Sequence, residues 1–213
     1  MLSTVARTVV PVFGRLRVTT DPDAEIVPGS IVAANHTSLV DPGVVLAALH
    51  RLGTEPVVLA TAGLWRVPVL RRMLTREGHV PVHRGTERAV LSLRDAAAAL
   101  EAGKTVLIYG EGGLPRRPDA AEAEPGPFRS GLARLALATG AAVVPLGQAG
   151  SRRISSGSAA KQVAGFVTAP LRRPDVHVHV GAPLRLSGDV VTATARARRA
   201  VVHAWRVAAD RAA

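Results

Sequence analysis

Short apolar runs rich in β-branched residues alternate along the chain with stretches whose apolar residues follow a helical spacing. Strands are predicted at residues 30–34, 56–60, 79–83, 104–109, 142–147 and 176–180. Helices are predicted at residues 42–52, 63–76, 86–102, 129–139 and 189–211. Because strands and helices of these lengths alternate, the pattern predicts a three-layer α/β/α domain with a mixed central sheet of about six or seven strands.

Two segments, 115–128 and 150–174, interrupt this alternation. Both are rich in Gly, Ser, Arg or Pro, which predicts long loops. The 213 residues are enough for one hydrophobic core and do not require a second. We therefore expect a single domain over residues 1–213, with a basic amphipathic segment at 1–24, a core at 25–185 and a C-terminal helix at 186–213.

Residues 1–18 and 63–76 both mix apolar side chains with arginines. Their apolar positions either face the core or lie on a membrane, and amphipathicity alone does not separate the two interpretations. Pro11 and Pro68 are expected to interrupt both segments as regular helices.

We expect no membrane-spanning segment, because no apolar run approaches the roughly 18 residues that a spanning helix needs. Arg7 interrupts the first apolar stretch and no small-residue cleavage site follows, so a secretory signal is not expected either. The chain has no cysteine, which excludes disulfides and thiolate chemistry. Together these features predict a peripheral protein at the cytoplasmic face of the plasma membrane.

The charge balance is strongly basic, with 27 Lys and Arg against 16 Asp and Glu, a formal net charge of +11. Such a chain attracts nucleic acid, anionic lipid headgroups or a phosphorylated substrate. Aromatic residues, on which single-stranded nucleic acids stack, make up only 3% of the chain. The composition therefore favours a membrane lipid surface as the partner and argues against nucleic acid.

The stretch AANHTSLVDPG, residues 33–43, places His36 and Asp41 directly after a predicted strand. Residues five apart point about 140° away from each other on a helix, so these two could meet only across a turn. Asp41 before Pro42 is also a good helix start, in which Asp41 caps the helix and His36 has no special role. The alternative is a catalytic pair, in which Asp41 orients His36 as a base.

The stretch LIYGEGGLPRR, residues 107–117, breaks a second predicted strand into glycines and ends in two arginines. The backbone N–H groups of successive glycines can approach an anion such as a phosphate, although a plain glycine turn explains the same pattern. His177 and His179 alternate on a predicted strand, which favours a solvated strand face over a metal site because no third ligand accompanies them. Ser38 lacks a nucleophile elbow, so a serine hydrolase is not supported.

Taken in order, four stretches resemble the characteristic blocks of the glycerolipid acyltransferase family, typified by lysophosphatidic acid acyltransferase. The resemblance covers about residues 25–185. Asn35, His36, Ser38 and Asp41 match the first block, Arg84 the second, Glu111 and Gly112 the third, and Val144 and Pro145 the fourth. Arg129 lies where a basic residue is common in this family. The third block departs from the family pattern Pro-Glu-Gly-Thr-Arg, with Gly110, Gly113 and Leu114 at its first, fourth and fifth positions.

The resemblance implies transfer of a fatty acyl group from acyl-CoA or an acyl carrier protein to the hydroxyl of a lysophospholipid such as 1-acyl-glycerol-3-phosphate. It implies that His36 is the general base, that Asp41 orients it, and that neither a metal nor a redox cofactor is needed. The acceptor's polar head would be bound by Arg84, Glu111, Gly112, Gly113, Arg116 and Arg129.

Three alternatives remain open at this stage. The altered third block is compatible with a different lipid acceptor, such as an amino-lipid or glycolipid intermediate. It is also compatible with a lipid-binding relative that has lost turnover. A basic nucleic-acid binder would instead show salt-sensitive binding to DNA or RNA.

Overall fold

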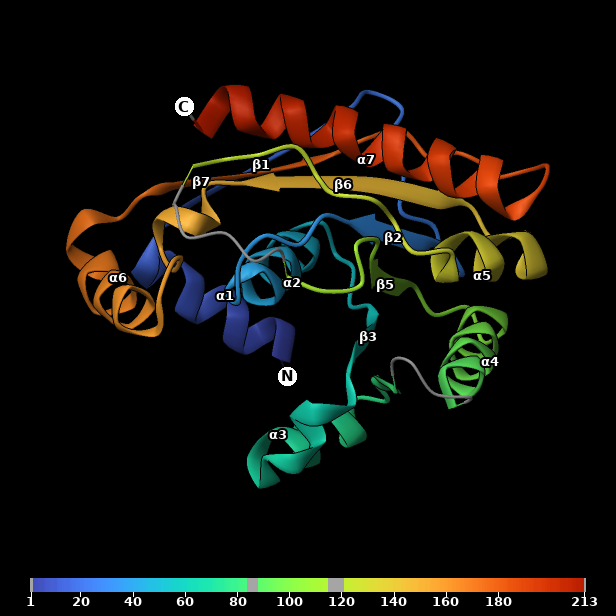
Figure 1. Cartoon of the computed structure of the whole chain (residues 1–213), viewed down its shortest axis with the longest axis horizontal. Coiled ribbons are helices and arrows are strands. Elements are labelled where there is room, and N and C mark those ends of the chain that lie inside the picture. Colours follow the sequence, from blue (N-terminus) through green and yellow to red (C-terminus); the bar gives the residue numbers. More distant parts are fainter. Residues whose placement is uncertain (1, 84–87, 115–120, 213) are drawn as a thin grey trace.

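A seven-stranded sheet forms the centre of the molecule, in the strand order β1-β7-β6-β2-β5-β3-β4 (Figure 1). The structure is a computed structural model that describes residues 2–83, 88–114 and 121–212. The strands are β1 (Arg15–Thr20), β2 (Ile31–Ala34), β3 (Val57–Thr61), β4 (Val80–Val82), β5 (Val106–Tyr109), β6 (Val143–Ala149) and β7 (Asp175–Val180). Five strands run parallel to one another, whereas β7 is antiparallel to β6 and parallel to β1, so the sheet is mixed as predicted.

Helices cover both faces of this sheet. The α-helices are α1 (Leu2–Phe13), α2 (Asp41–Arg51), α3 (Pro68–Arg76), α4 (Arg88–Glu101), α5 (Gly131–Thr139), α6 (Ala159–Arg172) and α7 (Val190–Ala212). Two 3₁₀ turns, η1 (Ala62–Arg66) and η2 (Ser151–Arg153), precede α3 and α6. One core cluster joins the sheet to α1, α2 and α6, and a second joins it to α4, α5 and α7. The predicted three-layer α/β/α architecture is therefore confirmed.

The central strand β2 explains how the two core clusters arise. Its four side chains are all buried, because β5 and β6 pair with it on both sides and helices cover both faces. Successive side chains of a strand point to opposite faces. Val32 and Ala34 accordingly pack in the cluster with α2, and Ile31 and Ala33 in the cluster with α4 and α5.

The longest helix, α7, lies along β6 at very close range (Figure 1). A Cβ atom on Gly147 would lie 2.1 Å from the backbone nitrogen of Trp205, so this approach requires glycine. The buried face of α7 is mostly small, with Ala193, Ala197, Val201, Ala204 and Ala208 directed inward. Small residues on the helix and a glycine on the strand together allow the two backbones to come close.

Two expectations about the N-terminal part of the chain are corrected. Within the 1–18 segment, residues 2–13 form α1 and the edge strand β1 begins at Arg15, and the sequence pattern did not predict this strand. Pro11 does not interrupt α1, because the helix continues through it to Phe13. The expectation for Pro68 is confirmed, because the 63–76 segment is not one helix: η1 ends at Arg66, Val67 is extended, as a residue before proline prefers to be, and α3 begins at Pro68.

The segment 150–174 is not a long loop, because it contains η2 and α6. The signal for α6 is Ser158, whose hydroxyl accepts a hydrogen bond from the backbone nitrogen of Lys161 at 3.4 Å and caps the helix. The segment 121–128, by contrast, has no regular secondary structure, as predicted. Among the described residues, no helix has both the length and the apolarity needed to cross a bilayer.

His177 and His179 do not form a solvated strand face. Both side chains are buried on β7. The ring of His179 contacts Thr19 Oγ1 at 3.0 Å and Asp21 Oδ1 at 3.1 Å. A buried ring needs such partners, and for His179 they come from Thr19 in β1, the strand beside β7, and from Asp21 directly after it.

Candidate active site

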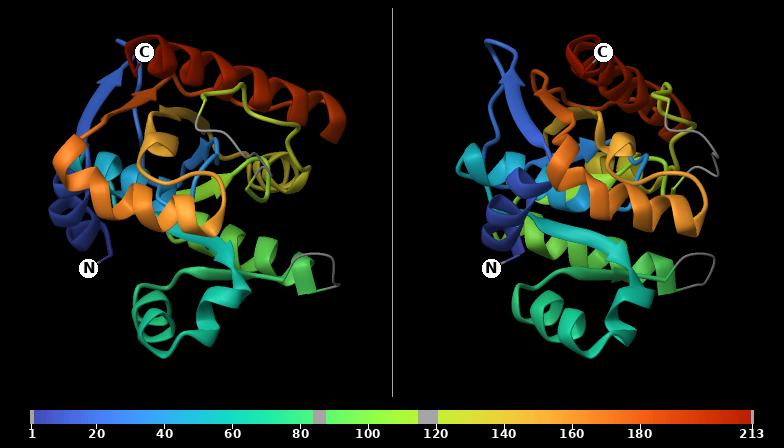
Figure 2. Two further views of the ribbon diagram at one scale, coloured as in Figure 1. Left: turned by 60° about the vertical axis from the view of Figure 1, so that its left-hand side comes forward. Right: turned by 90° about the vertical axis from the view of Figure 1, so that its left-hand side faces the viewer.

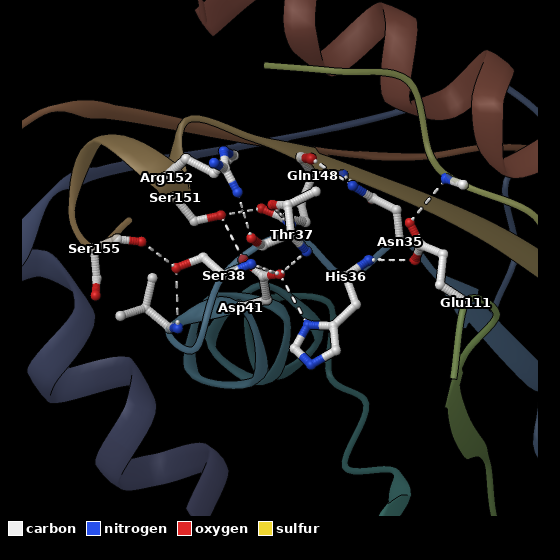
Figure 3. A network of polar contacts seen from close by, with 12 residues as sticks. Asn35, His36, Thr37, Ser38, Asp41, Glu111, Gln148, Ser151, Arg152 and Ser155 are labelled. Carbon is white, nitrogen blue, oxygen red and sulfur yellow. Dashed lines mark hydrogen bonds and ion pairs between the residues drawn. The ribbon is translucent and has the colours of Figure 1, made fainter. Parts of the chain in front are cut away.

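The candidate site lies where β2, β5 and β6 end at the same edge of the sheet (Figure 3). Asn35 directly follows β2 and extends the pairing of β2 with β6 through its side chain. Its Nδ2 donates to the carbonyl oxygen of Gln148 at 3.0 Å, and its Oδ1 accepts from the backbone nitrogen of Gln148 at 2.8 Å. Both residues are fully buried, so these bonds fix the point at which the chain leaves the sheet.

Asp41, the first residue of α2, holds the loop that follows Asn35. Its Oδ2 accepts hydrogen bonds from the backbone nitrogens of Thr37 at 2.5 Å and Ser38 at 2.7 Å, and it contacts His36 Nδ1 at 3.0 Å. The chain therefore wraps around one carboxylate oxygen, which brings His36 and Asp41 together despite their separation of five residues.

This geometry corrects the interpretation in which Asp41 only caps a helix. The N-cap position of α2 is Val40, and no side chain caps the helix there. The carboxylate of Asp41 instead accepts from groups in the preceding loop and from the ring of His36. Ser38 donates its hydroxyl hydrogen to the carbonyl oxygen of Ser155 at 2.7 Å, which ties the same loop to the segment before α6.

The contacts of His36 fix its tautomer. An aspartate carboxylate can only accept, so Nδ1 carries the hydrogen that faces Asp41 and Nε2 is left with a free lone pair. Among the described residues, none hydrogen-bonds Nε2. The His36 side chain is 14% exposed, whereas that of Asp41 is fully buried. An imidazole held in this way can accept a proton from a molecule that reaches it from solvent.

A second layer of polar groups supports the Asp41 carboxylate. Ser151, the first residue of η2, donates its hydroxyl hydrogen to Asp41 Oδ1 at 2.6 Å and also contacts the side-chain amide of Gln148. The buried Arg152 donates through Nη1 to the carbonyl oxygen of Thr37 at 2.9 Å. With four donors around it, the fully buried carboxylate is compensated for its lost hydration.

Glu111 links the histidine loop to the chain after β5. Its Oε2 accepts from the backbone nitrogen of His36 at 2.7 Å, and its Oε1 accepts from the backbone nitrogen of Gly126 at 3.3 Å. Burial raises the pKa of the Glu111 carboxyl to about 7, although the hydrogen bonds from His36 and Gly126 act in the opposite direction. Both carboxylate oxygens are therefore engaged in joining two loops at the site.

Tyr109, the last residue of β5, forms one wall beside the histidine. Its ring lies 4.4 Å from the His36 ring, centroid to centroid, at an interplanar angle of 31°. Burial raises the pKa of the Tyr109 hydroxyl well above its ordinary range, and the nearby Asp41 carboxylate acts in the same direction. The hydroxyl therefore stays protonated, and no described residue hydrogen-bonds it.

The glycine-rich stretch after Tyr109 is shaped by close contacts. Gly110 donates its backbone N–H to the carbonyl oxygen of Ala34 at 3.1 Å, which extends the pairing of β2 with β5. A Cβ on Gly110 would lie 2.2 Å from the Phe128 ring, and one on Gly112 would lie 2.9 Å from Arg129 Cγ. Gly112 also has a φ of +69°, which favours glycine.

The structure thus brings together only some of the predicted site residues. His36, Asp41 and Glu111 form one connected network, and Gly112, Gly113 and the exposed Arg129 lie beside it. Arg84 and Arg116 lie outside the described residues. Among the described residues, no group of three or more His, Asp or Glu side chains is placed to hold a metal ion.

Three residues at and just after the end of β6, namely Gln148, Ser151 and Arg152, were not predicted from the sequence. The sequence contains only an indirect signal for these residues. Parallel strands bring their carboxyl ends to one edge of the sheet, where ligands bind in α/β folds. If β2 and β6 had been predicted to pair in parallel, the residues that follow each strand would have been candidates for the same site.

Comparison with known proteins identifies the family. A family model described as Acyltransferase matches residues 15–148, more than half of the chain. Among solved structures, one similar to this chain is that of the 1-acyl-sn-glycerophosphate (LPA) acyltransferase PlsC from Thermotoga maritima, with a TM-score of 0.75 and 18% sequence identity. The similarity covers 97% of this chain and 77% of that one. No curated protein matches the chain. The family match confirms the enzyme class expected from the four sequence blocks, and the chain belongs to the Acyltransferase family.

Proposed function

We propose that this acyltransferase moves a fatty acyl group from acyl-CoA or an acyl carrier protein to the hydroxyl of a lysophospholipid such as 1-acyl-glycerol-3-phosphate, as a step in phospholipid biosynthesis. The observation that carries the proposal is the His36–Asp41 pair, whose Nδ1–Oδ2 distance is 3.0 Å and whose Nε2 atom is free to accept a proton. The Thermotoga maritima enzyme is named for an acceptor of this kind.

In the proposed reaction, His36 Nε2 takes the hydroxyl proton of the acceptor while the hydroxyl oxygen attacks the thioester carbonyl carbon. The resulting imidazolium is stabilised by the Asp41 carboxylate beside Nδ1. The tetrahedral intermediate then collapses, the carbon–sulfur bond breaks, and the departing sulfur takes the proton from His36. The products are an ester and a free thiol, with no acyl-enzyme and no need for a metal or redox cofactor.

We propose that the polar head of the acceptor binds at the end of β5. Arg129 follows the 121–128 segment and lies against Gly112, and its forked guanidinium suits a phosphate. The absence of a side chain at Gly112 lets Arg129 pack against the backbone there, and Gly113 directly follows it. Arg84 and Arg116 belong to the same proposal on the basis of the sequence resemblance. Glu111 contributes by holding the loops that position the head and the base.

One observation favours a second candidate acceptor. Leu114 occupies the position where the resemblance places an arginine, and Phe128 packs over Gly110 where it places a proline. Leu114 makes this side of the site less cationic, and the Phe128 ring adds an apolar group beside Gly110. An acceptor with a less anionic head, such as an amino-lipid or glycolipid intermediate, fits this arrangement.

The proposal places the protein at the cytoplasmic face of the plasma membrane as a peripheral protein. The net charge of +11 supports an anionic lipid surface as its partner. The acyl chains of acceptor and product also belong to such a surface.

The test is to incubate the purified chain with acyl-CoA or an acyl carrier protein thioester and a panel of lysolipids, and to identify products by mass spectrometry. We expect His36→Ala to lower acyl transfer by about 10²–10⁴-fold. His50→Ala is the matched control, because His50 lies in the last turn of α2 and its ring hydrogen-bonds, among the described residues, only the side chain of Glu55, at 3.2 Å. Wild-type turnover by His36→Ala would overturn the assignment, and lysolipid binding without thioester consumption would identify a lipid-binding relative.

A further inference from the structure

The helices α1 and α6 together present an apolar surface to solvent. On α6, Val163, Val167 and Leu171 are 64%, 69% and 89% exposed, and Phe166 is 43% exposed. On α1, Val5, Val9 and Val12 are also exposed. The spacing along each helix places these residues on one stripe, so they are not scattered singly over the surface. We name these seven residues the α1–α6 face.

Contacts between the two helices make this a single surface. The rings of Phe13 and Phe166 stack with their centroids 4.2 Å apart. Arg173 donates through Nη2 to the carbonyl oxygen of Pro11 at 3.3 Å. Figure 2 shows α1 and α6 side by side on the same side of the sheet. The buried positions of α1, Ser3, Ala6 and Val10, lie on its inner side, so α1 has two apolar faces and only one of them serves the core.

The charge on these two helices has one sign. Neither α1 nor α6 contains an acidic residue, whereas Arg7, Lys161, Arg172 and the adjacent Arg173 are basic and exposed. An apolar stripe with cations around it matches a bilayer that carries anionic headgroups, since the apolar side chains can enter the acyl boundary while the cations meet the phosphates. A second copy of this chain is a poorer occupant, because it would bring two sets of cations together.

The two helices that carry the face contact the elements of the candidate active site through their inner side and through the segment before α6. A Cβ on Gly43 in the first turn of α2 would lie 3.7 Å from Val10 of α1. The segment before α6 accepts the hydrogen bond from Ser38, in the loop that carries His36. The helices that carry the face are therefore linked to the loop that holds the base.

We propose that the α1–α6 face is the surface by which the protein seats itself on an anionic lipid bilayer. The choice of a lipid surface rests on the proposed function, but the seating itself does not require turnover. The projecting η1–α3 segment, which also exposes Val69, is the competing contact within the chain (Figure 1).

The test is flotation of the purified full chain with vesicles of phosphatidylcholine, with and without phosphatidylglycerol. We expect the double variant Val167→Asp, Leu171→Asp and the single variant Val9→Asp to lower partition onto the anionic vesicles, the double variant by at least about tenfold. The matched control is Val191→Asp on α7, where the side chain is 80% exposed on the opposite layer, and we expect no loss of binding. Binding should also fall strongly on vesicles without phosphatidylglycerol.

Several results would overturn the proposal. One is that the folded α1 and α6 variants bind like the wild type, and another is that Val69→Asp alone abolishes binding, which would assign the contact to α3. A third is that light scattering reports a dimer that the double variant dissociates, which would make the face a contact between copies. Loss of acyl carrier protein binding with vesicle binding intact would assign the face to that partner. Since flotation needs no substrate, vesicle binding through this face by an inactive chain would refute the proposed function and leave this inference standing.

Discussion

Replacing Asp41 by asparagine separates the charge of this residue from its hydrogen bonds. If the amide oxygen takes the place of Oδ2, it can still accept from His36 Nδ1, Thr37 N and Ser38 N. The amide NH₂ then faces the hydroxyl oxygen of Ser151, which can accept in place of donating. We therefore expect Asp41→Asn to fold, with a loss of stability of about 1–2 kcal/mol.

The loss of the charge should affect the reaction far more than the fold. With Nδ1 3.0 Å from Oδ2, the charge centres of an imidazolium and the carboxylate lie about 4 Å apart, which corresponds to about 4 kcal/mol at an effective dielectric constant of about 20. The asparagine cannot supply this stabilisation when His36 takes the acceptor's proton. A loss of that size lowers the rate of proton transfer by about 10³-fold.

The assay is kcat/KM for thioester consumption, followed by the release of free thiol, alongside urea unfolding followed by tryptophan fluorescence. Asp21→Asn is the matched control, because Asp21 contacts His179 at 3.1 Å in a second histidine–aspartate pair away from the site. It should leave kcat/KM unchanged. The reasoning is refuted if Asp41→Asn keeps kcat/KM within about threefold of the wild type, where the loss expected from its charge is about 10³-fold. In that case Asp41 serves only to hold the loop.

Two further predictions concern the groups around this pair. Ser151→Ala should lower the unfolding free energy measured in urea titrations by about 2 kcal/mol, because it removes one of the donors to the buried Asp41 carboxylate. Ser30→Ala is the control, since no described residue hydrogen-bonds its buried hydroxyl. Equal losses of stability in the two variants would contradict the reasoning. Glu111→Gln should alter how stability depends on pH, because the folded pKa of about 7 lies above the unfolded value of 4.5. The contribution of the Glu111 carboxyl to the unfolding free energy is therefore fully present below about pH 4.5, and up to about 3 kcal/mol of it is lost as the pH rises through 7. Unfolding free energies measured from pH 4.5 to 8 should show this loss in the wild type relative to the variant, and parallel curves would exclude it.

Six of the seven strands of the central sheet were predictable, because each of them carries a local signal. Ile31, Val32, Ala33 and Ala34 form a short apolar run, as a strand covered on both faces requires, and their burial matches that requirement. The edge strand β1 had no such signal, because Arg15 and Arg17 on its exposed side made the segment resemble an amphipathic surface helix. What decides its structure is pairing with β7, which lies about 160 residues later in the chain.

The two members of the candidate catalytic pair were predictable from the sequence, but their geometry was not. The spacing of His36 and Asp41 allowed both a helix cap and a turn-mediated contact. The choice between them depends on Thr37 and Ser38, whose backbone nitrogens turn toward Asp41 Oδ2. Ser151 could not be assigned, because its role depends on β6 lying beside β2 and on a turn at Gly150 with a φ of +93°. Local patterns do not contain such long-range pairings.

The altered third block is best understood as a repacked surface, because its changes are coupled to one another. A proline at position 110 could not donate the hydrogen bond that Gly110 makes to Ala34, and its ring would occupy the space that Phe128 fills. Glu111 and Gly112 nevertheless keep specific roles, one holding the backbone of His36 and the other turning the chain beside Arg129. Loss of function would not be expected to preserve a fully supported Asp41 carboxylate and a correctly oriented His36. Under the proposed function, these contacts support a retained reaction with a modified acceptor surface, and the lysolipid panel is the experiment that identifies which acceptor that surface selects.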